Sequence, residues 1–216
     1  MRHFLFFVIP EIIFIFVFRR NKFRFVPEFI STMKKRKSNR LKGYDYSKDN
    51  LYFVTNCVKN NLCCLGCVIP VGTGRDLSVH HHHHPENHHP EIQYKVELNQ
   101  YGKIVDERIN WLISQYEYVD IHNYVVMPNH LHLILEIDSQ KVKEQDVKKI
   151  KSISSLMGAM KTTSSNKIHE AGFTDFAWHR SFHDHIIRSE KSYINIFNYI
   201  SNNPNNWCKD KFHKGD

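Results

Sequence analysis

The sequence predicts an α+β domain, a ferredoxin-like (RRM-like) sandwich in which helices cover one face of an antiparallel sheet. The first observation behind this prediction is the order of the segments, because apolar spacings typical of strands and helices follow one another as strand, helix, strand, strand, helix, strand, helix. The second is the tight turn expected at Met127-Pro128-Asn129, since proline fixes φ and supplies no N–H group to a strand ladder.

The first half of the domain is predicted to hold two strands and a helix. Leu51–Val58 is rich in aromatic and β-branched residues, as strands usually are. Lys95–Leu98 is predicted to be a short strand that ends in a turn at Asn99–Gly102. Ile104–Tyr116 is predicted to be a helix, because its apolar residues recur at helical spacing and acidic residues stand near its start.

The second half is predicted to hold a strand that carries His130 and His132 and continues to Ile137, together with two further strands and two helices. Val119–Met127 is the next strand, and Asp146–His169 is predicted to be a helix from its apolar stripe. Phe182–Arg188 is predicted to be the last strand. Glu190–Asn203 is predicted to be the closing helix, ended by Pro204.

The composition favours a polyanionic partner. The chain has 216 residues, a formal net charge of +8 and a pI near 9.2, and a basic balance of this kind suits nucleic acid. The five cysteines are odd in number and bunched, which does not indicate a secreted disulfide framework, so we expect a cytoplasmic protein. A basic arm at Lys34–Lys42 is either a solvated tail or a phosphate-neutralising segment. Its candidate DNA-binding residues are Lys34, Lys35, Arg36, Lys37 and Arg40.

Residues 1–33 depart from the pattern of the rest and are predicted to lie outside the fold. The apolar run Phe4–Phe18 is shorter than the roughly 20 residues that a membrane-spanning helix needs. We hypothesise that Met33 is the natural start, with the folded domain at 34–207 and a polar tail at 208–216. A membrane anchor at the N-terminus is the alternative.

An insertion is predicted at about residues 68–92, between the first strand and the first helix. Cys64 and Cys67 have the C-x-x-C spacing, and a histidine-rich tract follows from His80 to His89. No second pair completes a zinc module, and two prolines favour an irregular loop with exposed histidines. A structural zinc site is the alternative reading.

Two pairs of residues are candidates for chemistry. His130 and His132 share one face of the strand that continues to Ile137, while Leu131 and Leu133 share the other, because strand side chains alternate. The histidines could share one divalent ion or could simply be partly exposed. Tyr199 and Asn203 are four residues apart and so share one helix face, either at the same site or as a core tyrosine and a helix cap.

Three blocks in this order resemble the REP-associated tyrosine transposases, a group of HUH single-tyrosine nucleases related to insertion-sequence transposases. They are Val-Met-Pro-Asn-His-Leu-His-Leu-Ile at 126–134, Trp-His-Arg-Ser-Phe-His-Asp-His-Ile-Ile-Arg at 178–188, and Tyr-Ile-Ser-Asn-Asn-Pro at 199–204. The resemblance runs from about Arg36 to Trp207. HUH nucleases have a similar fold, so the resemblance agrees with the fold class that the pattern predicts.

The resemblance implies a DNA endonuclease and strand transferase. Tyr199 would attack a phosphodiester of single-stranded DNA near a hairpin and form a 5′-phosphotyrosine. His130, His132 and Asn203 would hold Mg²⁺ or Mn²⁺. Members of the group are monomers or homodimers, and no membrane or small-molecule substrate is expected. Lys161 and Arg188 are further candidates for DNA contacts.

Two other functions are compatible with the same residues. One is a hairpin-binding protein without turnover on the same fold. The other is a zinc hydrolase that uses His130, His132 and an acid such as Glu136, with Tyr199 in the core. The second His-x-His sequence, at His183 and His185, lacks the clean division of faces and is interpreted as support beside the site.

Overall fold

The computed structural model describes residues 6–9, 12–15, 43–71, 92–142 and 149–213. The chain divides into two units, Met1–Ser38 and Asn39–Asp216. In the first unit, β1 (Phe6–Ile9) and β2 (Ile12–Ile15) form an antiparallel pair. The predicted start at Met33 lies outside the described residues. None of the helices in the described part of the chain is long and apolar enough to span a membrane.

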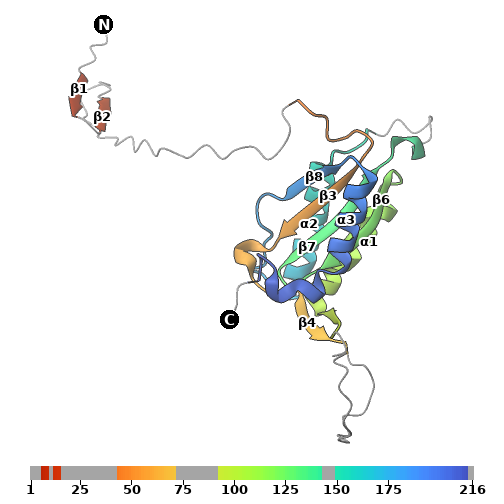
Figure 1. The fold of residues 1–216 in the computed structure, drawn as a ribbon. Helices are drawn as coiled ribbons and strands as arrows, with labels where there is room; N and C mark the ends of the chain where they lie inside the picture. Colours follow the sequence, from red (N-terminus) through yellow and green to blue (C-terminus); the bar gives the residue numbers. More distant parts are fainter. Residues whose placement is uncertain (1–5, 10–11, 16–42, 72–91, 143–148, 214–216) are drawn as a thin grey trace, which may run out of the picture. The chain divides into compact units, whose positions relative to one another are not determined.

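The second unit is built on a four-stranded antiparallel sheet in the order β6-β7-β3-β8 (Figure 1). Its strands are β3 (Asn50–Cys57), β6 (Val119–Val126), β7 (His130–Ile137) and β8 (His183–Ile187). The helices are α1 (Gln100–Gln115), α2 (Ile153–Glu170) and α3 (Glu190–Ser201). Short 3₁₀ turns occur at η1 (Lys59–Asn61), η2 (Ser139–Lys141) and η3 (Pro204–Lys209). The predicted α+β class and antiparallel sheet are confirmed.

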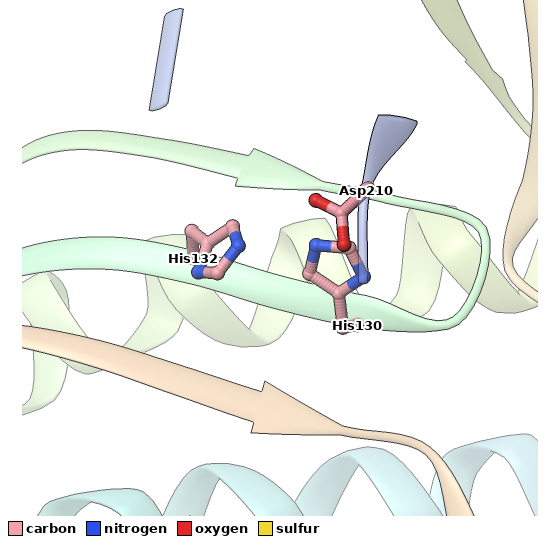
Figure 2. A group of neighbouring side chains, drawn as sticks. All are labelled: His130, His132 and Asp210. Carbon is pink, nitrogen blue, oxygen red and sulfur yellow. The ribbon is translucent and has the colours of Figure 1, made fainter. Parts of the chain in front are cut away.

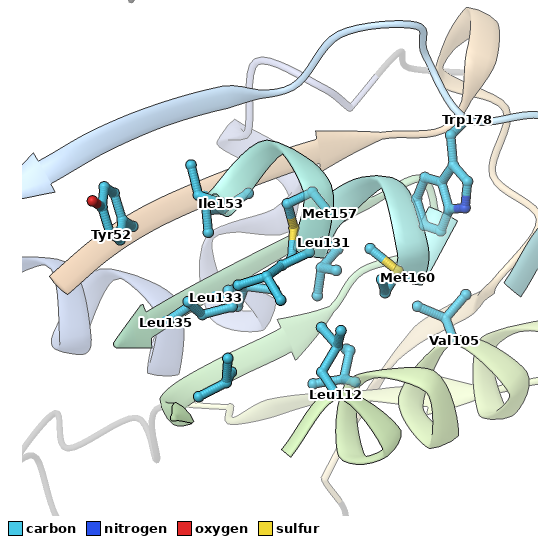
Figure 3. Close-up of a cluster of buried hydrophobic side chains, with 14 of the residues drawn as sticks. Tyr52, Val105, Leu112, Leu131, Leu133, Leu135, Ile153, Met157, Met160 and Trp178 are labelled. Atoms are coloured by element: carbon cyan, nitrogen blue, oxygen red, sulfur yellow. The ribbon is translucent and has the colours of Figure 1, made fainter. Parts of the chain in front are cut away.

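The helices lie on both faces of the sheet rather than on one. The larger hydrophobic core joins the sheet to α1 and α2, through residues such as Leu133, Leu112 and Met157 (Figure 3). A smaller cluster on the opposite face joins Ile134 of β7 to Ile200 of α3. We expected all helices on one face of the sheet, and α1 and α2 do lie on one face. Helix α3 instead covers part of the opposite face, which we expected to be open. The apolar residues of α3 face this second side of the sheet, which explains the difference.

Strand β7 is buried on both faces, and its alternation divides them. Leu131, Leu133, Leu135 and Ile137 belong to the larger core. His130, His132 and Ile134 lie on the α3 side and are also fully buried or nearly so. This is the division that period-2 alternation predicts, and it places the histidines under α3 instead of in solvent.

Side-chain caps set the beginnings of the helices. The Asn99 side chain accepts hydrogen bonds from the backbone N–H groups of Tyr101 (2.9 Å) and Gly102 (3.1 Å), so α1 begins four residues earlier than predicted. A side chain at Gly102 would collide with the carbonyl oxygen of Leu65, so glycine is required where α1 passes the backbone of Leu65. Ser152 caps α2, which begins at Ile153 and not at Asp146; residues 143–148 are outside the described part.

A two-stranded ribbon stands apart from the main sheet. It pairs β4 (Gly66–Pro70) with β5 (Tyr94–Leu98) in antiparallel register. The strand expected at Lys95–Leu98 is thus present, but the start of the insertion expected at about 68–92, predicted to be an irregular loop, belongs to a strand as well. Its partner is more than twenty residues away in sequence, so local pattern could not reveal the pairing. The histidine-rich tract falls outside the described residues.

We predict that truncating Leu133 will strongly destabilise the domain. Its side chain is fully buried between the sheet and two helices, and Leu133→Ala should lower the free energy of unfolding by about 2–5 kcal/mol because a cavity replaces it. Urea unfolding of Leu133→Ala and of Ile113→Ala, an exposed position on α1, provides the comparison. Equal losses in the two variants would contradict the described core.

Candidate active site

Two buried imidazoles occupy the beginning of β7. His130 and His132 are at most 1% exposed, and their ring centroids are 4.6 Å apart. The turn before them is closed by a hydrogen bond from the backbone N–H of Met127 to the carbonyl of His130 (2.8 Å). Figure 2 shows both rings on the same side of the strand. The sequence prediction that these histidines share one face is therefore confirmed.

Each histidine is held through its Nδ1 atom. His130 Nδ1 lies 2.8 Å from the side-chain oxygen of Asn129. His132 Nδ1 lies 2.8 Å from the hydroxyl of Thr55, its cross-strand neighbour on β3. Buried polar atoms are normally hydrogen-bonded, yet Nε2 of His130 has no partner in the described part of the structure. The two Nε2 atoms are thus the ones available for chemistry.

Helix α3 brings Tyr199 to the same place. Its hydroxyl lies 3.3 Å from Nε2 of His132, although the residue as a whole is 43% exposed. The Asn123 side chain holds the helix on β6 by donating to the carbonyl of Phe197 (3.0 Å) and the hydroxyl of Ser201 (2.9 Å). A bulge in β6 next to Asn123 accompanies this contact. Tyr199 therefore meets both the histidine and solvent.

The polar group is completed by Asn203 and Asp210. Asn203 is buried, and its side-chain oxygen has no hydrogen-bond partner among the described residues, while its nitrogen lies 3.3 Å from the carboxylate of Asp210. Ligand atoms of His130, His132 and Asp210 all lie within 4.8 Å of one another (Figure 2). Sequence reasoning missed Asp210, which lies beyond the closing helix in the segment expected to be a polar tail. Residues up to Phe212 instead pack against the site.

Aromatic rings surround the two imidazoles. Phe53 stacks on His132 with centroids 5.4 Å apart, and Phe212 lies 4.7 Å from His130. Trp207 is 6.0 Å from His130 on the same wall. These rings keep water away from the imidazoles, which makes a positive charge on either one costly.

Burial accordingly lowers both histidine pKa values. It lowers the pKa of His130 to about 4, although the nearby Asp210 and the Asn203 side chain act in the opposite direction. It lowers the pKa of His132 to about 2, with smaller contributions from His130 and Lys211. Both imidazoles are therefore neutral at pH 7, which is the form that binds metal ions.

Burial also raises the pKa of Tyr199, and the charge of Asp210 adds to the effect. The phenol is therefore protonated at neutral pH in the metal-free protein. To act as a nucleophile it must lose this proton, so the environment of its oxygen decides its reactivity.

The donor set fits a divalent cation. Two neutral imidazoles, one amide oxygen and one carboxylate converge. Two of the buried atoms, Nε2 of His130 and the side-chain oxygen of Asn203, have no hydrogen-bond partner among the described residues. Mixed nitrogen and oxygen ligands of this kind suit Mn²⁺ and Zn²⁺, while Mg²⁺ favours oxygen. The residues present are thus able to hold one ion beside the Tyr199 hydroxyl.

Comparison with known proteins assigns the family. A sequence-family model described as "Transposase IS200 like" matches residues 81–203, more than half of the chain, and this range includes the two histidines, Tyr199 and Asn203. The chain belongs to the IS200-like transposase family. An uncharacterized protein of Haemophilus influenzae is 31% identical over 190 residues, covering 82% of this chain and 93% of that protein.

Two solved structures are also similar. One is described as a REP-associated tyrosine transposase bound to a REP hairpin, with 17% identity, a TM-score of 0.47, and coverage of 80% of this chain and 76% of that one. The other is described as a candidate transposase from Deinococcus radiodurans, with 16% identity, a TM-score of 0.39, and coverage of 76% and 95%. The family assignment does not depend on either of them.

Of the residues expected to contact DNA, Lys161 is bonded within the fold and Arg188 is exposed. Lys161 directs its ammonium group to the backbone carbonyls of His179 (2.6 Å) and Arg180 (3.2 Å), and burial lowers its pKa. It thus ties α2 to the loop before β8. Arg188 is exposed just after β8. The basic arm, with Lys34, Lys35, Arg36, Lys37 and Arg40, lies outside the described residues.

Glu136, His183 and His185 were also candidates, but the structure does not bring them into the group around His130 and His132. Glu136, the acid considered for a hydrolase, bonds His122 at 2.8 Å, and His122 in turn contacts Tyr193. The acid beside the two buried histidines is Asp210. His183 and His185 are exposed on β8, where His183 lies opposite Thr55 on the same face of the sheet as the site.

We predict that the protein loses stability in acid because of the two buried histidines. In the unfolded chain they take up protons near pH 6.5, whereas the folded protein keeps the pKa of His130 at about 4 and that of His132 at about 2. The unfolded state therefore binds more protons below pH 6.5. The free energy of unfolding should fall by about 2 kcal/mol per histidine between pH 7 and pH 5, which urea unfolding at both pH values measures.

The control for this prediction is a pair of histidine variants. His130→Gln/His132→Gln should lose most of the pH dependence, while His185→Gln, at an exposed position, should keep it. The same dependence of unfolding free energy on pH in wild type and the double variant would contradict the lowered pKa values of the two histidines.

Proposed function

We propose that the chain is a metal-dependent single-stranded DNA endonuclease and strand transferase that acts through Tyr199. The observation that carries this proposal is the position of the Tyr199 hydroxyl, 3.3 Å from Nε2 of His132 and next to a buried set of metal-binding groups. Membership of the IS200-like transposase family places the chain among DNA-processing enzymes. The tyrosine, the metal and the phosphotyrosine are the parts that we add.

In this proposal His130, His132, Asn203 and Asp210 hold Mg²⁺ or Mn²⁺. The bound ion would supply Lewis-acid polarisation of a phosphodiester oxygen and stabilise the charge that develops on it. Asp210 adds a negative charge to a site whose other three groups are neutral, and a charged ligand strengthens the binding of hard divalent ions. The rings of Phe53, Trp207 and Phe212 exclude water from the site. The absence of water strengthens these electrostatic interactions.

Tyr199 is the proposed nucleophile. Its oxygen attacks phosphorus and forms a 5′-phosphotyrosine, while the bond from phosphorus to the 3′ oxygen breaks. The tyrosine proton leaves and the departing oxygen gains one, which gives a free 3′-OH. A different 3′-OH can then attack the phosphotyrosine and rejoin strands without ATP. The 43% exposure of Tyr199 allows a phosphodiester to reach it.

Single-stranded DNA that carries a hairpin is the proposed substrate. One similar structure is described as bound to a REP hairpin, and the net charge of +8 on this chain suits a nucleic acid. We retain Arg188 and the basic arm at 34–42 as proposed phosphate contacts. Lys161 is a weaker candidate, because two of its hydrogen bonds go to backbone carbonyls. A monomer and a homodimer are both compatible with the described residues.

We predict a covalent protein–DNA adduct that depends on Tyr199 and the two histidines. The protein incubated with Mn²⁺ and end-labelled single-stranded DNA containing flanking hairpins should yield an adduct on a denaturing gel. Tyr199→Phe should abolish it by removing the nucleophilic oxygen, and His130→Ala/His132→Ala should abolish it by removing the nitrogen ligands.

The matched control is Tyr193→Phe, which removes a hydroxyl from the same helix at a position bonded to His122. This variant should form the adduct at the wild-type level. DNA binding without any adduct in the wild type would favour a non-catalytic hairpin-binding protein instead.

We predict that Asp210→Asn weakens Mn²⁺ binding by roughly tenfold or more, because it removes the charged ligand from the site. Isothermal titration without DNA measures the affinity, after subtraction of the binding left in His130→Ala/His132→Ala, since the histidine-rich tract can also bind metal. Asp175→Asn, at an exposed position, is the matched control. Equal affinities in Asp210→Asn and wild type would remove Asp210 from the proposed ligand set.

A further inference from the structure

The side chain of Asn129 bridges three separate segments beside the histidines. It is buried, with 1% exposure. Its nitrogen donates to the carbonyl of Asn61 (3.1 Å), at the end of η1, and to the carbonyl of Phe212 (2.9 Å), near the end of the chain. Its oxygen faces Nδ1 of His130 at 2.8 Å. All three contacts are made by one amide group.

These partners determine which way the amide points. A backbone carbonyl can only accept a hydrogen bond, so the atom that faces Asn61 and Phe212 must be the NH₂ group. The atom that faces His130 is then the oxygen, which can only accept. Nδ1 of His130 must therefore carry the hydrogen, and the lone pair of the neutral ring must lie on Nε2.

The same amide also supports the segment that carries Asp210. Phe212 lies two residues beyond Asp210, and its backbone N–H donates to the Asp210 carboxylate at 2.7 Å. Phe212 is thus bonded to Asn129 through its carbonyl and to Asp210 through its N–H. The donor atom of His130 and the position of the acid both depend on one buried side chain.

We propose that Asn129 is a positioning residue that fixes His130 with Nε2 toward the metal site and holds the Asp210 segment against it. The inference rests on the metal site of the proposed function, and it adds a residue that would not touch the ion. Partners that orient a ligand in this way commonly change metal affinity by about 10–100-fold. Metal binding and the packing of residues 210–212 would then be coupled.

Two substitutions separate the two roles. Asn129→Asp keeps an oxygen that can accept from Nδ1 of His130 but loses both donations to carbonyls. Asn129→Ala loses all three bonds. The backbone is less affected in either variant, because the carbonyl of residue 129 still accepts from the N–H of Val58 (2.8 Å). Asn110→Ala, at an exposed position on α1, is the matched control.

The experiment measures the full chain without DNA. Long-range ¹H–¹⁵N NMR at pH 7 reports which nitrogen of His130 carries the hydrogen, with the signal assigned through His130→Gln. Hydrogen exchange of the Phe212 amide reports the packing of its segment. Titration with Mn²⁺ gives the affinity, with the binding left in His130→Ala/His132→Ala subtracted.

We expect hydrogen on Nδ1 of His130 in the wild type and in Asn129→Asp, with faster exchange at Phe212 in the latter. Asn129→Ala should lose the single tautomer and bind Mn²⁺ about 10–100-fold more weakly. Hydrogen on Nε2 of His130 in the wild type would overturn the proposal. This measurement uses only the wild-type protein, so it does not depend on whether a variant folds. Unchanged tautomer and affinity in Asn129→Ala would overturn it too. Absence of a DNA adduct with these results intact would count against the proposed function alone.

Discussion

The burial of β7 on both faces is the constraint on which the rest of the structure depends. A strand in the middle of a sheet can present one set of side chains to each side. In β7 the leucines enter the core shared with α1 and α2, and the histidines lie under α3. The register with β3 then places Thr55 opposite His132. Stability and chemistry are therefore built into alternate positions of one segment.

Burying the histidines costs free energy, and a bound metal ion would offset part of that cost. Desolvation keeps both rings neutral, and it leaves Nε2 of His130 and the oxygen of Asn203 without partners in the described structure. An unsatisfied buried polar atom costs about 1–3 kcal/mol. A cation bound at this place would satisfy both atoms and would balance the charge of Asp210. The proposed metal site would thus account for these two buried polar atoms.

In the proposed function, the exposed side of Tyr199 would give substrate access to the buried polar groups around His130 and His132. The tyrosine ring contacts His132 and Phe53 on one side and solvent on the other. Asn203, one helical turn later, is buried beneath it. In the proposed function, Tyr199 of α3 would meet the incoming phosphodiester, and Asn203, just after the end of α3, would bind the ion. The hydrogen bonds from Asn123 hold α3 in place.

Much of this could be predicted from the sequence, because the signals were local. Alternation in β7 and the spacing of Tyr199 and Asn203 depend only on neighbouring residues, and the structure brings these four groups together. The ribbon of β4 and β5 joins strands far apart in sequence, so no local pattern indicated its pairing. The roles of Asp210 and Asn129 could not be predicted, because they depend on the segment after α3, which folds back over the histidines. No spacing of residues in the sequence indicates that the chain turns back there.

Pulsed EPR spectroscopy of the Mn²⁺-loaded protein in the absence of DNA tests the metal site most directly. If His130 and His132 bind the ion, the spectrum will show hyperfine coupling to two imidazole nitrogens that disappears in His130→Ala/His132→Ala. Because histidines of the 80–89 tract are also able to bind metal, the comparison with that double variant decides the outcome. Identical nitrogen coupling in both proteins would contradict the claim that β7 carries the metal site.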